Sequence, residues 1–276
     1  KIMEINKIYL INLLLLLLLI NIATSNSCRD DKIQPEYKLI KKHSRSNETI
    51  LSRAKLSSLK LCQEFSISKK ALAFNFRNIK NSTMNNHDVN NNRHDDTYQF
   101  NCQALACPEI KSMTSLVYDK HYSYYSLYDN KTMPINQTIY CLKKIGLFVY
   151  YEDVNNYKNA KLTCDNIQAK LASIESYEKS ENLSKFIFNK ATFVGLINHG
   201  KIRRWKNDFD ESLSCFNFRS WAPDEPSSRG CVALIRSKIR GNYHGLWTVV
   251  PCSQSLPFIC EIIPEYLMEK NLINDK

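Results

Sequence analysis

Ten cysteines are the residues of this chain with the widest range of chemistry. A cysteine can act as a nucleophile, hold a metal ion or form a disulfide, and the cellular compartment decides among these roles. His87 and His94 lie in an asparagine-rich stretch with no cysteine or second ligand pair beside them, which favours a polar loop over a metal site. No Gly-x-Ser-x-Gly, His-Glu-x-x-His or phosphate-loop motif is present. We therefore expect neither an enzyme nor a catalytic residue.

The amino-terminal segment indicates the compartment. A nearly unbroken run of Leu and Ile from 8 to 22 precedes the small residues Ala23-Thr24-Ser25, which is typical of a secretory signal peptide cleaved near Ser25. The alternative is an uncleaved membrane anchor, but Asn12 and Asn21 shorten the run below the roughly 20 residues that span a bilayer. We expect a secreted, extracellular product that contacts a membrane only if this segment is retained.

Export changes the interpretation of the cysteines. In an oxidising compartment an even number of cysteines predicts disulfides, here five. Five Asn-x-Ser/Thr sequons agree with export, because N-glycans are added to exposed sites of exported proteins. The sequons are Asn47, Asn81, Asn130, Asn136 and Asn182.

Length and composition indicate a globular protein of two modest domains. The chain has 276 residues, of which 43% are hydrophobic and 24% charged, and these values exclude collagen-like, coiled-coil and wholly disordered classes. The net charge of +11 favours acidic partners, while secretion disfavours a nucleic-acid role. From the cysteine grouping we expect a signal peptide (1–25), a disulfide module (26–108), a Tyr-rich linker (109–140), a second domain (141–263) and a tail (264–276).

The first domain shows a pattern of one helix followed by two strands. Leu51, Ala54, Leu61, Cys62 and Phe65 share one helical face, and alternating apolar residues then mark strands at 72–76 and 98–102. A helix packed on a short sheet would bring Cys62 to Cys102, and Cys28 would then pair with Cys107. With its helix cysteine and its Ala73-Phe74-Asn75-Phe76 and Asn101-Cys102-Gln103-Ala104 strands, this stretch loosely resembles a PAN or apple-type module. Other small helix-on-sheet disulfide modules give the same pattern.

The second domain shows an α+β pattern of helices followed by short strands. Tyr157, Ala160, Cys164 and Ile167 fall at helical spacing, and a second helix is expected around Leu183–Ile187. Short strands are then expected at 192–196, 231–235, 246–250 and 257–261, with an irregular stretch from Cys215 to Gly230.

Several motifs of this domain, in order, resemble the C-type lectin-like family. They are the opening segment from Tyr157 to Ile174 with its helix cysteine and Leu-Ala strand, the strand Val194-Gly195-Leu196, the segment Trp221-Ala222-Pro223-Asp224-Glu225-Pro226, and the closing Pro257-Phe258-Ile259-Cys260-Glu261. The resemblance implies an α+β fold with two helices, short antiparallel strands and a long binding loop. It also implies the disulfides Cys164–Cys260 and Cys231–Cys252, and pairing Cys141 with Cys215 is then the simplest completion.

The resemblance also identifies where a calcium ion would bind. Sugar-binding members hold calcium with a Glu-Pro-Asn or Gln-Pro-Asp triplet, a nearby acid and a Trp-Asn-Asp triplet, because calcium takes six to eight oxygen ligands. Here the corresponding triplets are Glu225-Pro226-Ser227 and Trp247-Thr248-Val249. Of the calcium ligands in these triplets, one carboxylate remains, that of Glu225. We expect no metal ion and no cofactor, with calcium-dependent sugar binding through this loop as the alternative.

Glu225, Ser227, Thr248 and the basic residues nearby are the candidate binding residues. Either the loop presents Glu225 to a partner, or Pro226, in a cis peptide bond, shapes the turn while Glu225 pairs with an arginine; we favour the second interpretation. Trp205, Trp221 and Trp247 are expected to be core residues rather than a stacking platform. A basic stripe is expected to steer anionic ligands, with simple solvation as the alternative. Its residues are Arg203, Arg204, Arg236, Lys238 and Arg240.

The sequence as a whole predicts a secreted, calcium-independent recognition or adhesion protein. Its partner would be an extracellular protein or an anionic glycan, bound through the loop region from Asp208 to Gly245. The alternative is a calcium-dependent carbohydrate-binding lectin with a degenerate site, acting in innate immunity.

Overall fold

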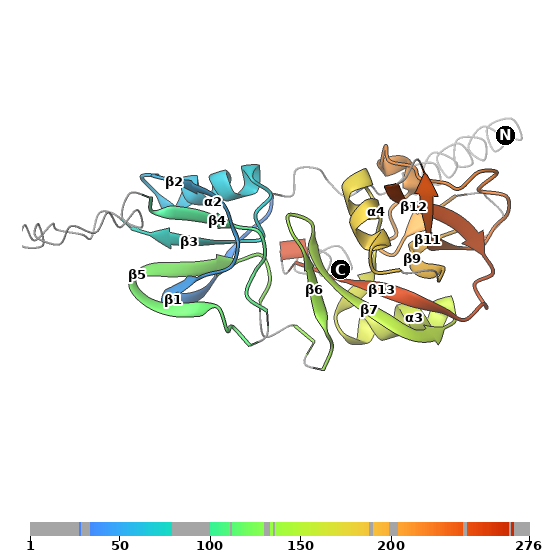
Figure 1. The fold of residues 1–276 in the computed structure, drawn as a ribbon, viewed down its shortest axis with the longest axis horizontal. Helices are drawn as coiled ribbons and strands as arrows, with labels where there is room; N and C mark the ends of the chain where they lie inside the picture. The colour runs from blue at the N-terminus through green and yellow to red at the C-terminus, as the bar shows by residue number, and fades with distance from the viewer. Residues whose placement is uncertain are drawn as a thin grey trace, which may run out of the picture.

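The computed structural model describes residues 28, 34–78, 100–110, 112–129, 133–134, 136–187, 190–198, 204–239, 242–264 and 266–267. These residues form two lobes, each built around its own β-sheet (Figure 1). The expected signal peptide lies outside the described residues. Within the described part of the chain, no helix has the length and apolar character needed to cross a membrane.

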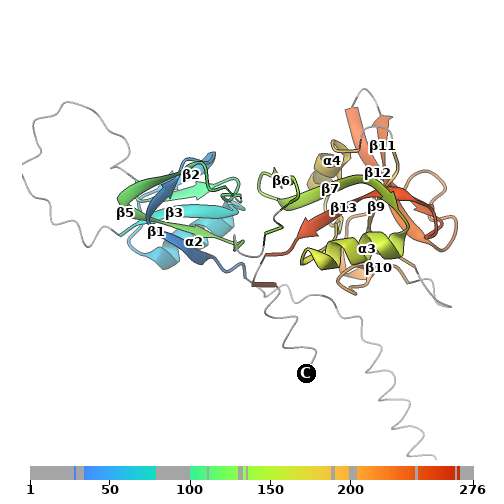
Figure 2. The ribbon, with the colours of Figure 1, turned by 90° about the horizontal axis from the view of Figure 1, so that it is seen from below.

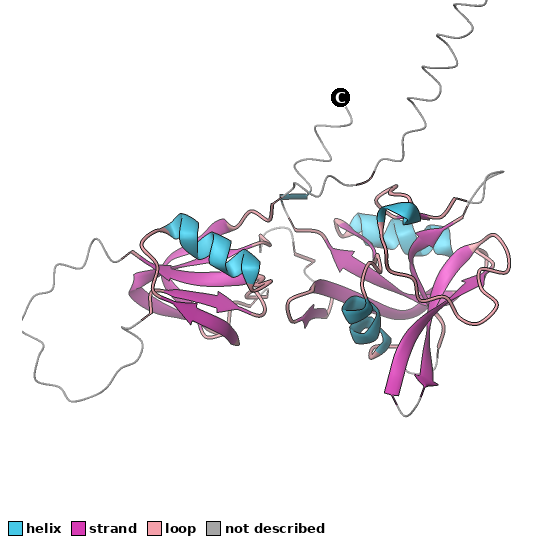
Figure 3. Ribbon diagram, turned by 90° about the horizontal axis from the view of Figure 1, so that it is seen from above, coloured by secondary structure: helices cyan, strands magenta, loops and turns pink. Residues whose placement is uncertain are grey.

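The first sheet has five strands in the order β1-β5-β3-β4-β2, and all neighbouring strands are antiparallel. Its strands are β1 (Lys38–Ser46), β2 (Ile50–Ala54), β3 (Ala73–Arg77), β4 (Cys102–Leu105) and β5 (Leu116–Ser126). The helix α2 (Leu59–Ser68) lies over one face of this sheet (Figure 3). Ser58 caps the helix by accepting a hydrogen bond from Leu61 N at 3.3 Å. Phe74, Phe76 and Cys102 are buried beneath it. The apolar residues that alternate in the sequence therefore form the face of the sheet on which α2 packs.

Two expectations for this lobe are wrong. The helix expected from Leu51 to Phe65 begins only at Leu59, because Ile50–Ala54 pairs with β4 as an edge strand. The stretch 109–140, expected to be a linker, contains β5, which pairs with both β1 and β3. Tyr122, Tyr124 and Ser126 of β5 are buried at alternating positions, so the tyrosines belong to a strand. The resemblance to PAN or apple modules stays a prediction.

The second sheet has eight strands. Its main path is β12-β11-β9-β13-β7-β6, with β10 pairing β9 and β8 pairing β13; the pairing of β13 with β9 is parallel and the others are antiparallel. The strands are β6 (Ile139–Leu142), β7 (Gly146–Asn155), β8 (Ala169–Leu171), β9 (Thr192–Ile197), β10 (Lys206–Asn207), β11 (Cys231–Ile239), β12 (Asn242–Val250) and β13 (Leu256–Ile262).

Two helices and one 3-10 turn accompany this sheet. They are α3 (Tyr157–Asn166), α4 (Tyr177–Ser184) and η3 (Leu213–Cys215). Figure 2 shows α3 beside β13. The expected α+β class is confirmed for this lobe, and so are α3 and the four strands expected after it. Strands β6 and β7 were not expected, and α4 begins earlier than expected because Ser176 caps it.

Five disulfides join all ten cysteines. The pairs Cys62–Cys102, Cys164–Cys260 and Cys231–Cys252 are those expected. The two remaining expectations are wrong, because Cys107 pairs with Cys141 and Cys28 pairs with Cys215. Cys107 follows β4 and Cys141 lies in β6, so this bridge joins the two lobes, whereas each of the expected pairings would have stayed within one lobe.

Further contacts hold the lobes together beside the Cys107–Cys141 bridge. Lys144 N donates to Ala106 O at 3.3 Å, and Lys70 Nζ of the first lobe lies 3.6 Å from Glu178 Oε2 of the second. Tyr128, which follows β5, is buried, and a Cβ added at Gly146 would lie 3.2 Å from its hydroxyl oxygen. The end of the first domain is therefore packed into the start of the second.

Candidate functional site

The long segment between β10 and β11 is anchored to the sheet at its beginning. Asn207 is buried and donates from Nδ2 to Glu211 Oε2 at 2.7 Å, while its Oδ1 accepts from Phe209 N and Glu211 N. Asp208 accepts hydrogen bonds from Lys161 Nζ and from Leu171 N. Burial raises the pKa of the Asp208 carboxyl, and the Lys161 ammonium opposes this rise. From the sequence, Asp208 was expected only as one end of the loop region, because its partners Lys161 and Leu171 lie far away in the chain.

An aromatic cluster fixes the middle of the same segment against β12. Trp247 is 1% exposed, and the Trp221 ring packs edge-on against it with centroids 5.3 Å apart. Trp205 lies 5.0 Å from Trp221, and Phe218 lies 5.5 Å from Trp247. The backbone continues this contact, since Trp247 N donates to Ser220 O and Ala222 N donates to Trp247 O. Trp247 is thus a core residue, and Trp205 and Trp221 are half-buried around it.

The Glu225 carboxylate lies at the far end of this segment, next to a cis peptide bond between Glu225 and Pro226. Glu225 Oε1 accepts from Thr248 Oγ1 at 3.0 Å, and Oε2 accepts from Ser227 N at 2.8 Å and Ser227 Oγ at 3.1 Å. Partial burial raises the pKa of Glu225, but these hydrogen bonds and one from the Val249 backbone outweigh it, so the pKa lies below its usual value. The structure brings Glu225, Ser227 and Thr248 together, and the cis bond expected at Pro226 is present.

The oxygen atoms around Glu225 do not fit a calcium ion. Calcium in proteins takes six to eight oxygen ligands, several of them carboxylate oxygens. Glu225 supplies one carboxylate here, both of its oxygens already accept hydrogen bonds, and Val249 supplies an apolar side chain. Across the described ranges, no three His, Cys, Asp or Glu side chains come together as a metal site.

The basic candidates form a separate group on the β11–β12 hairpin. The Arg236 guanidinium carbon lies 3.7 Å from the centroid of the Tyr243 ring, and Lys238 Nζ lies 5.9 Å from it. In the hairpin register Arg236 is opposite Gly245 and Lys238 is opposite Tyr243, whereas Thr248 is opposite Ala233. The two groups of candidates therefore lie at different positions along the hairpin. Arg204 is exposed, while Arg203 and Arg240 lie outside the described residues.

Helix α4 supports the hairpin from one side. Ser180 Oγ donates to Gly245 O at 3.0 Å, and Ser220 Oγ donates to the same oxygen at 2.7 Å. Tyr177 Oη and His244 Nδ1 share a hydrogen bond of 3.2 Å. Tyr177 and Tyr243 are 54% and 46% exposed. The Tyr243 ring lies beside Arg236 and Lys238, whereas Tyr177 contacts His244 of the same hairpin. Neither tyrosine was predicted from the sequence, although the alternation of Arg236 with Lys238, followed by Tyr243 across a short turn, was an available signal.

The five sequons differ in their surroundings. Asn47 and Asn136 are exposed, as a glycan requires. Asn182 lies within α4, where its Nδ2 donates to Glu178 O at 2.8 Å and its Oδ1 accepts from Lys185 Nζ at 3.1 Å. Asn81 and Asn130 lie outside the described residues. Glycosylation at these positions stays a prediction.

Comparisons with known proteins match the second lobe. Residues 153–262 match the family model of the C-type lectin domain. Mouse Proteoglycan 3 is 30% identical over 119 residues, 41% of this chain and 50% of that protein; human Layilin is 29% identical over 138 residues, 42% of this chain and 36% of that protein. Human lithostathine is a similar solved structure, with 26% identity, a TM-score of 0.36, and coverage of 42% of this chain and 89% of that one. The chain spans half or less of the curated relatives it matches.

Proposed function

We propose, on the premise that residues 153–262 form a C-type lectin-like domain, that this chain is a secreted, calcium-independent recognition protein. Its ligand is an anionic group, carried by a glycan or by an extracellular protein surface. The loop region and the β11–β12 hairpin form the binding surface. The role is one of binding and adhesion rather than catalysis.

Calcium independence is supported by one observation above all, the hydrogen bonding of Glu225. This carboxylate is the strongest ligand of the family's calcium set that the chain retains, and it is bound within the protein by Ser227 and Thr248. Binding of a calcium ion to Glu225 would break these hydrogen bonds, and few other oxygen atoms nearby could serve as ligands of the ion. In this proposal Glu225 stabilises the turn at Pro226 and does not serve as a metal ligand.

The anionic character of the ligand is supported by Arg236 and Lys238. Both side chains extend on the same face of β11 beside the Tyr243 ring. Arg236 Nε is buried and makes no hydrogen bond within the described part of the chain. A guanidinium held 3.7 Å from the centroid of an aromatic ring is fixed in position and can present its outer N–H groups to a sulfate or carboxylate.

Two measurements test the proposal. Calcium titration followed by thermal melting should leave the midpoint unchanged, whereas an ion at 100 times its Kd would stabilise the fold by about 2.7 kcal/mol. A glycan array run with and without a chelator should show binding to sulfated or acidic glycans that the chelator does not alter. Chelator-sensitive binding would instead support a calcium-dependent lectin, and a blank array would direct the search to protein partners.

A paired variant locates the anionic contact. Arg236→Gln with Lys238→Gln should weaken binding of the anionic ligand, because both cations of the hairpin are removed. Lys143→Gln with Lys158→Gln is the matched control, since these exposed lysines belong to the same domain and the charge change is the same. Equal weakening by the two pairs would contradict a specific site on the hairpin.

A further inference from the structure

A pocket of about 320 Å³ lies in the first lobe, where the first turn of α2 meets the strands β3 and β5. This volume is within the range of sites that bind small molecules, roughly 300–1,000 Å³. We call it the β5–α2 pocket. The residues that line it include Leu59, Phe76, Lys120, His121, Ser123 and Tyr125.

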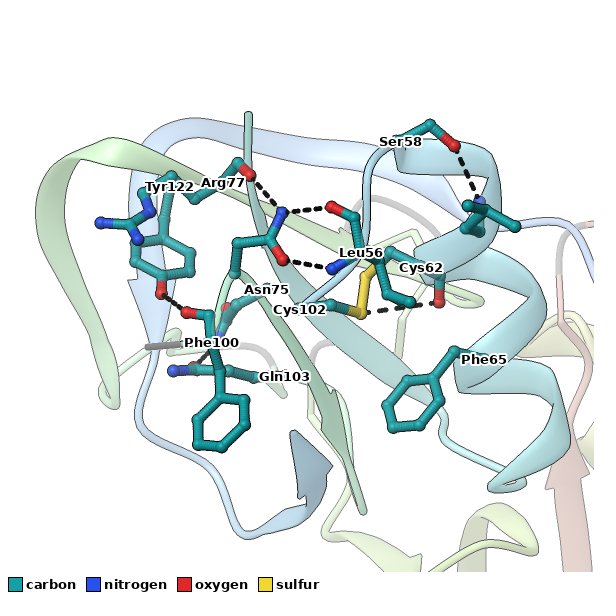
Figure 4. The surroundings of a disulfide bond; sticks show 12 residues. Leu56, Ser58, Cys62, Phe65, Asn75, Arg77, Phe100, Cys102, Gln103 and Tyr122 are labelled. Carbon is teal, nitrogen blue, oxygen red and sulfur yellow. Dashed lines mark hydrogen bonds between the residues drawn. A yellow bond between two sulfur atoms is a disulfide. The ribbon is translucent and has the colours of Figure 1, made fainter. Parts of the chain in front are cut away.

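The apolar wall of the β5–α2 pocket is held in place by the fold. Leu59 is the first residue of α2, and the Cys62–Cys102 disulfide joins this helix to β4 (Figure 4). The Tyr125 ring stacks on Phe74 with the two ring centroids 4.7 Å apart. A ligand would therefore meet a preformed apolar surface, which an aromatic ring supplies to the C–H face of a sugar as well as to other apolar groups.

An irregularity of β5 brings two adjacent residues into the lining. Between two register pairs of β1 with β5, β1 has the single residue His43 where β5 has residues 119–122. These pairs are Lys42 with Ser123 and Ser44 with Tyr118. Successive side chains of a regular strand point to opposite faces, and a bulge changes their direction locally. Lys120 and His121 both line the pocket, and His43 Nδ1 supports the bulge by donating to Lys120 O at 3.1 Å.

The lysines at this pocket lack an acidic partner among the described residues. Lys42 is the register partner of a lining residue of β5, so its side chain lies on the same face of the sheet. Neither Lys42 nor Lys120 forms an ion pair with another described residue. The carboxylate next to Lys120 in the chain is engaged elsewhere, because Asp119 Oδ1 accepts from His121 N at 3.1 Å and Oδ2 lies 3.7 Å from Arg45 Nε. The pocket therefore favours a ligand that carries a negative charge.

Two hydroxyl groups of the lining are available to a ligand. Ser123 Oγ and Tyr125 Oη make no hydrogen bond with another described residue. Partial burial raises the pKa of Tyr125, so its hydroxyl keeps its proton and can donate. A ligand that suits the pocket thus has hydroxyl groups, an apolar ring face and one negative charge. A sugar with a carboxylate group has all three.

We propose that the β5–α2 pocket binds a sugar residue that carries a carboxylate. Phe76 and Tyr125 pack against the C–H face of the sugar ring, and Ser123 shares a hydrogen bond with a sugar hydroxyl. Lys120 donates to the carboxylate, and Lys42 adds attraction at longer range. This site lies in the first lobe, so it goes beyond the function proposed for the hairpin of the second.

The first test compares acidic and neutral sugars on the full chain. The probes are methyl β-glucuronide, methyl α-N-acetylneuraminide and methyl β-glucoside, of which the last lacks the carboxylate. Saturation-transfer NMR titrations should give at least one acidic glycoside an affinity about tenfold above that of the glucoside, because a hydrogen bond to a charged group is lost in the neutral sugar. Equal affinity for all three, or no binding of either acidic glycoside, would overturn the proposal.

A single charge change tests the role of Lys120. Lys120→Gln should weaken binding of the acidic glycoside about tenfold, because it removes the cation that pairs with the carboxylate. The matched control is Lys69→Gln, an exposed lysine just after α2, which lies about 15 Å from Leu59 along the helix axis. This control should change the affinity less than twofold. The proposal fails if the two variants lose affinity equally, since attraction would then depend only on net charge.

Filling the pocket tests its location without changing its charge. Ser123→Leu adds apolar volume to the lining and should abolish binding of the acidic glycoside. Ser123→Val, a smaller change, should weaken binding in the same direction. Thermal melting shows which of these variants keep the stability of the original protein. If a variant melts like the original protein and also binds the glycoside within twofold of it, the sugar does not occupy this pocket.

The hairpin variants separate this site from the surface proposed above. Arg236→Gln with Lys238→Gln should leave the affinity for the acidic glycoside within twofold of the original value. If that pair abolishes binding while Lys120→Gln has no effect, the β5–α2 pocket is refuted and the glycoside binds at the hairpin. Loss in Lys120→Gln alone supports the pocket, whatever the array shows for the hairpin.

Discussion

At the scale of single residues, Glu225 is the side chain whose role changes most once its neighbours are known. Its carboxylate accepts hydrogen bonds from Ser227, Thr248 and the Val249 backbone, and their combined effect lowers its pKa despite partial burial. These donors come from the turn after Pro226 and from β12. Glu225 therefore ties the long loop to the hairpin by hydrogen bonds that favour the ionised form.

This arrangement predicts a specific pH dependence of stability. An acid whose pKa is lowered by folding contributes stability above its unfolded pKa, near 4.5, and loses it as pH falls through the folded value. Glu225→Gln should therefore lower the free energy of unfolding by its full amount at pH 7. The difference in this free energy between the variant and the original protein should shrink below pH 4.5. Urea unfolding of both proteins at several pH values measures this. A difference that stays constant down to pH 3 would contradict the role assigned to the ionised carboxylate.

At the scale of secondary-structure elements, the hairpin and α4 position the hairpin cations. Gly245 is the contact point, because its carbonyl oxygen accepts from both Ser180 and Ser220. A Cβ added at Gly245 would lie 2.7 Å from Ser180 O, a backbone atom of α4 that cannot move independently of the helix. Close packing of α4 on β12 therefore requires glycine at this position.

Gly245→Ala should thus separate α4 from the hairpin. We expect a destabilisation of about 1–3 kcal/mol from overpacking, together with weaker ligand binding through Arg236, the register partner of Gly245. Chemical denaturation and a binding measurement on the same sample check the two effects. If the unfolding midpoint of Gly245→Ala equals that of the original protein, the close packing of α4 on β12 at Gly245 is contradicted.

At the scale of the whole molecule, two disulfides connect segments that the sequence assigns to different domains. Cys107–Cys141 joins the end of the first sheet to the first strand of the second, and Cys28–Cys215 ties the amino-terminal side of the first lobe to the long loop. The other three disulfides lie within one lobe each. Cys62, Cys102, Cys164, Cys260 and Cys231 are 0% exposed, whereas Cys28 is exposed.

Exposure predicts the order in which the disulfides are reduced. An attacking thiolate must reach a sulfur atom, so Cys28–Cys215 should be cleaved first by a mild reductant under native conditions. Cys62–Cys102 and Cys164–Cys260 should resist until the protein unfolds. Timed alkylation followed by mass spectrometry gives the order directly. Early labelling of Cys164 or Cys260 would contradict the burial of that pair.

Local sequence patterns were sufficient to predict most elements of the second domain. Tyr157, Ala160 and Cys164 at helical spacing gave α3, and the short apolar runs after it gave β9, β11, β12 and β13. Local periodicity was sufficient because each of these elements buries one continuous face. Ordered motifs then indicated the resemblance to the C-type lectin-like family, whose domain model matches residues 153–262, and the three disulfides within single lobes were also anticipated.

Features that depend on distant residues follow from the three-dimensional packing of the chain and could not be predicted from local patterns. Leu51 and the tyrosines around Tyr122 have weak local patterns, and their strands form because β4, β1 and β3 supply hydrogen-bonding partners. The partners of Cys28 and Cys107 depend on how the two lobes meet, which no local pattern encodes. Likewise, Arg45, Arg53 and Arg77 are separated in the chain and gather at Tyr122 only through sheet pairing, because strand order rather than sequence spacing sets which side chains become neighbours.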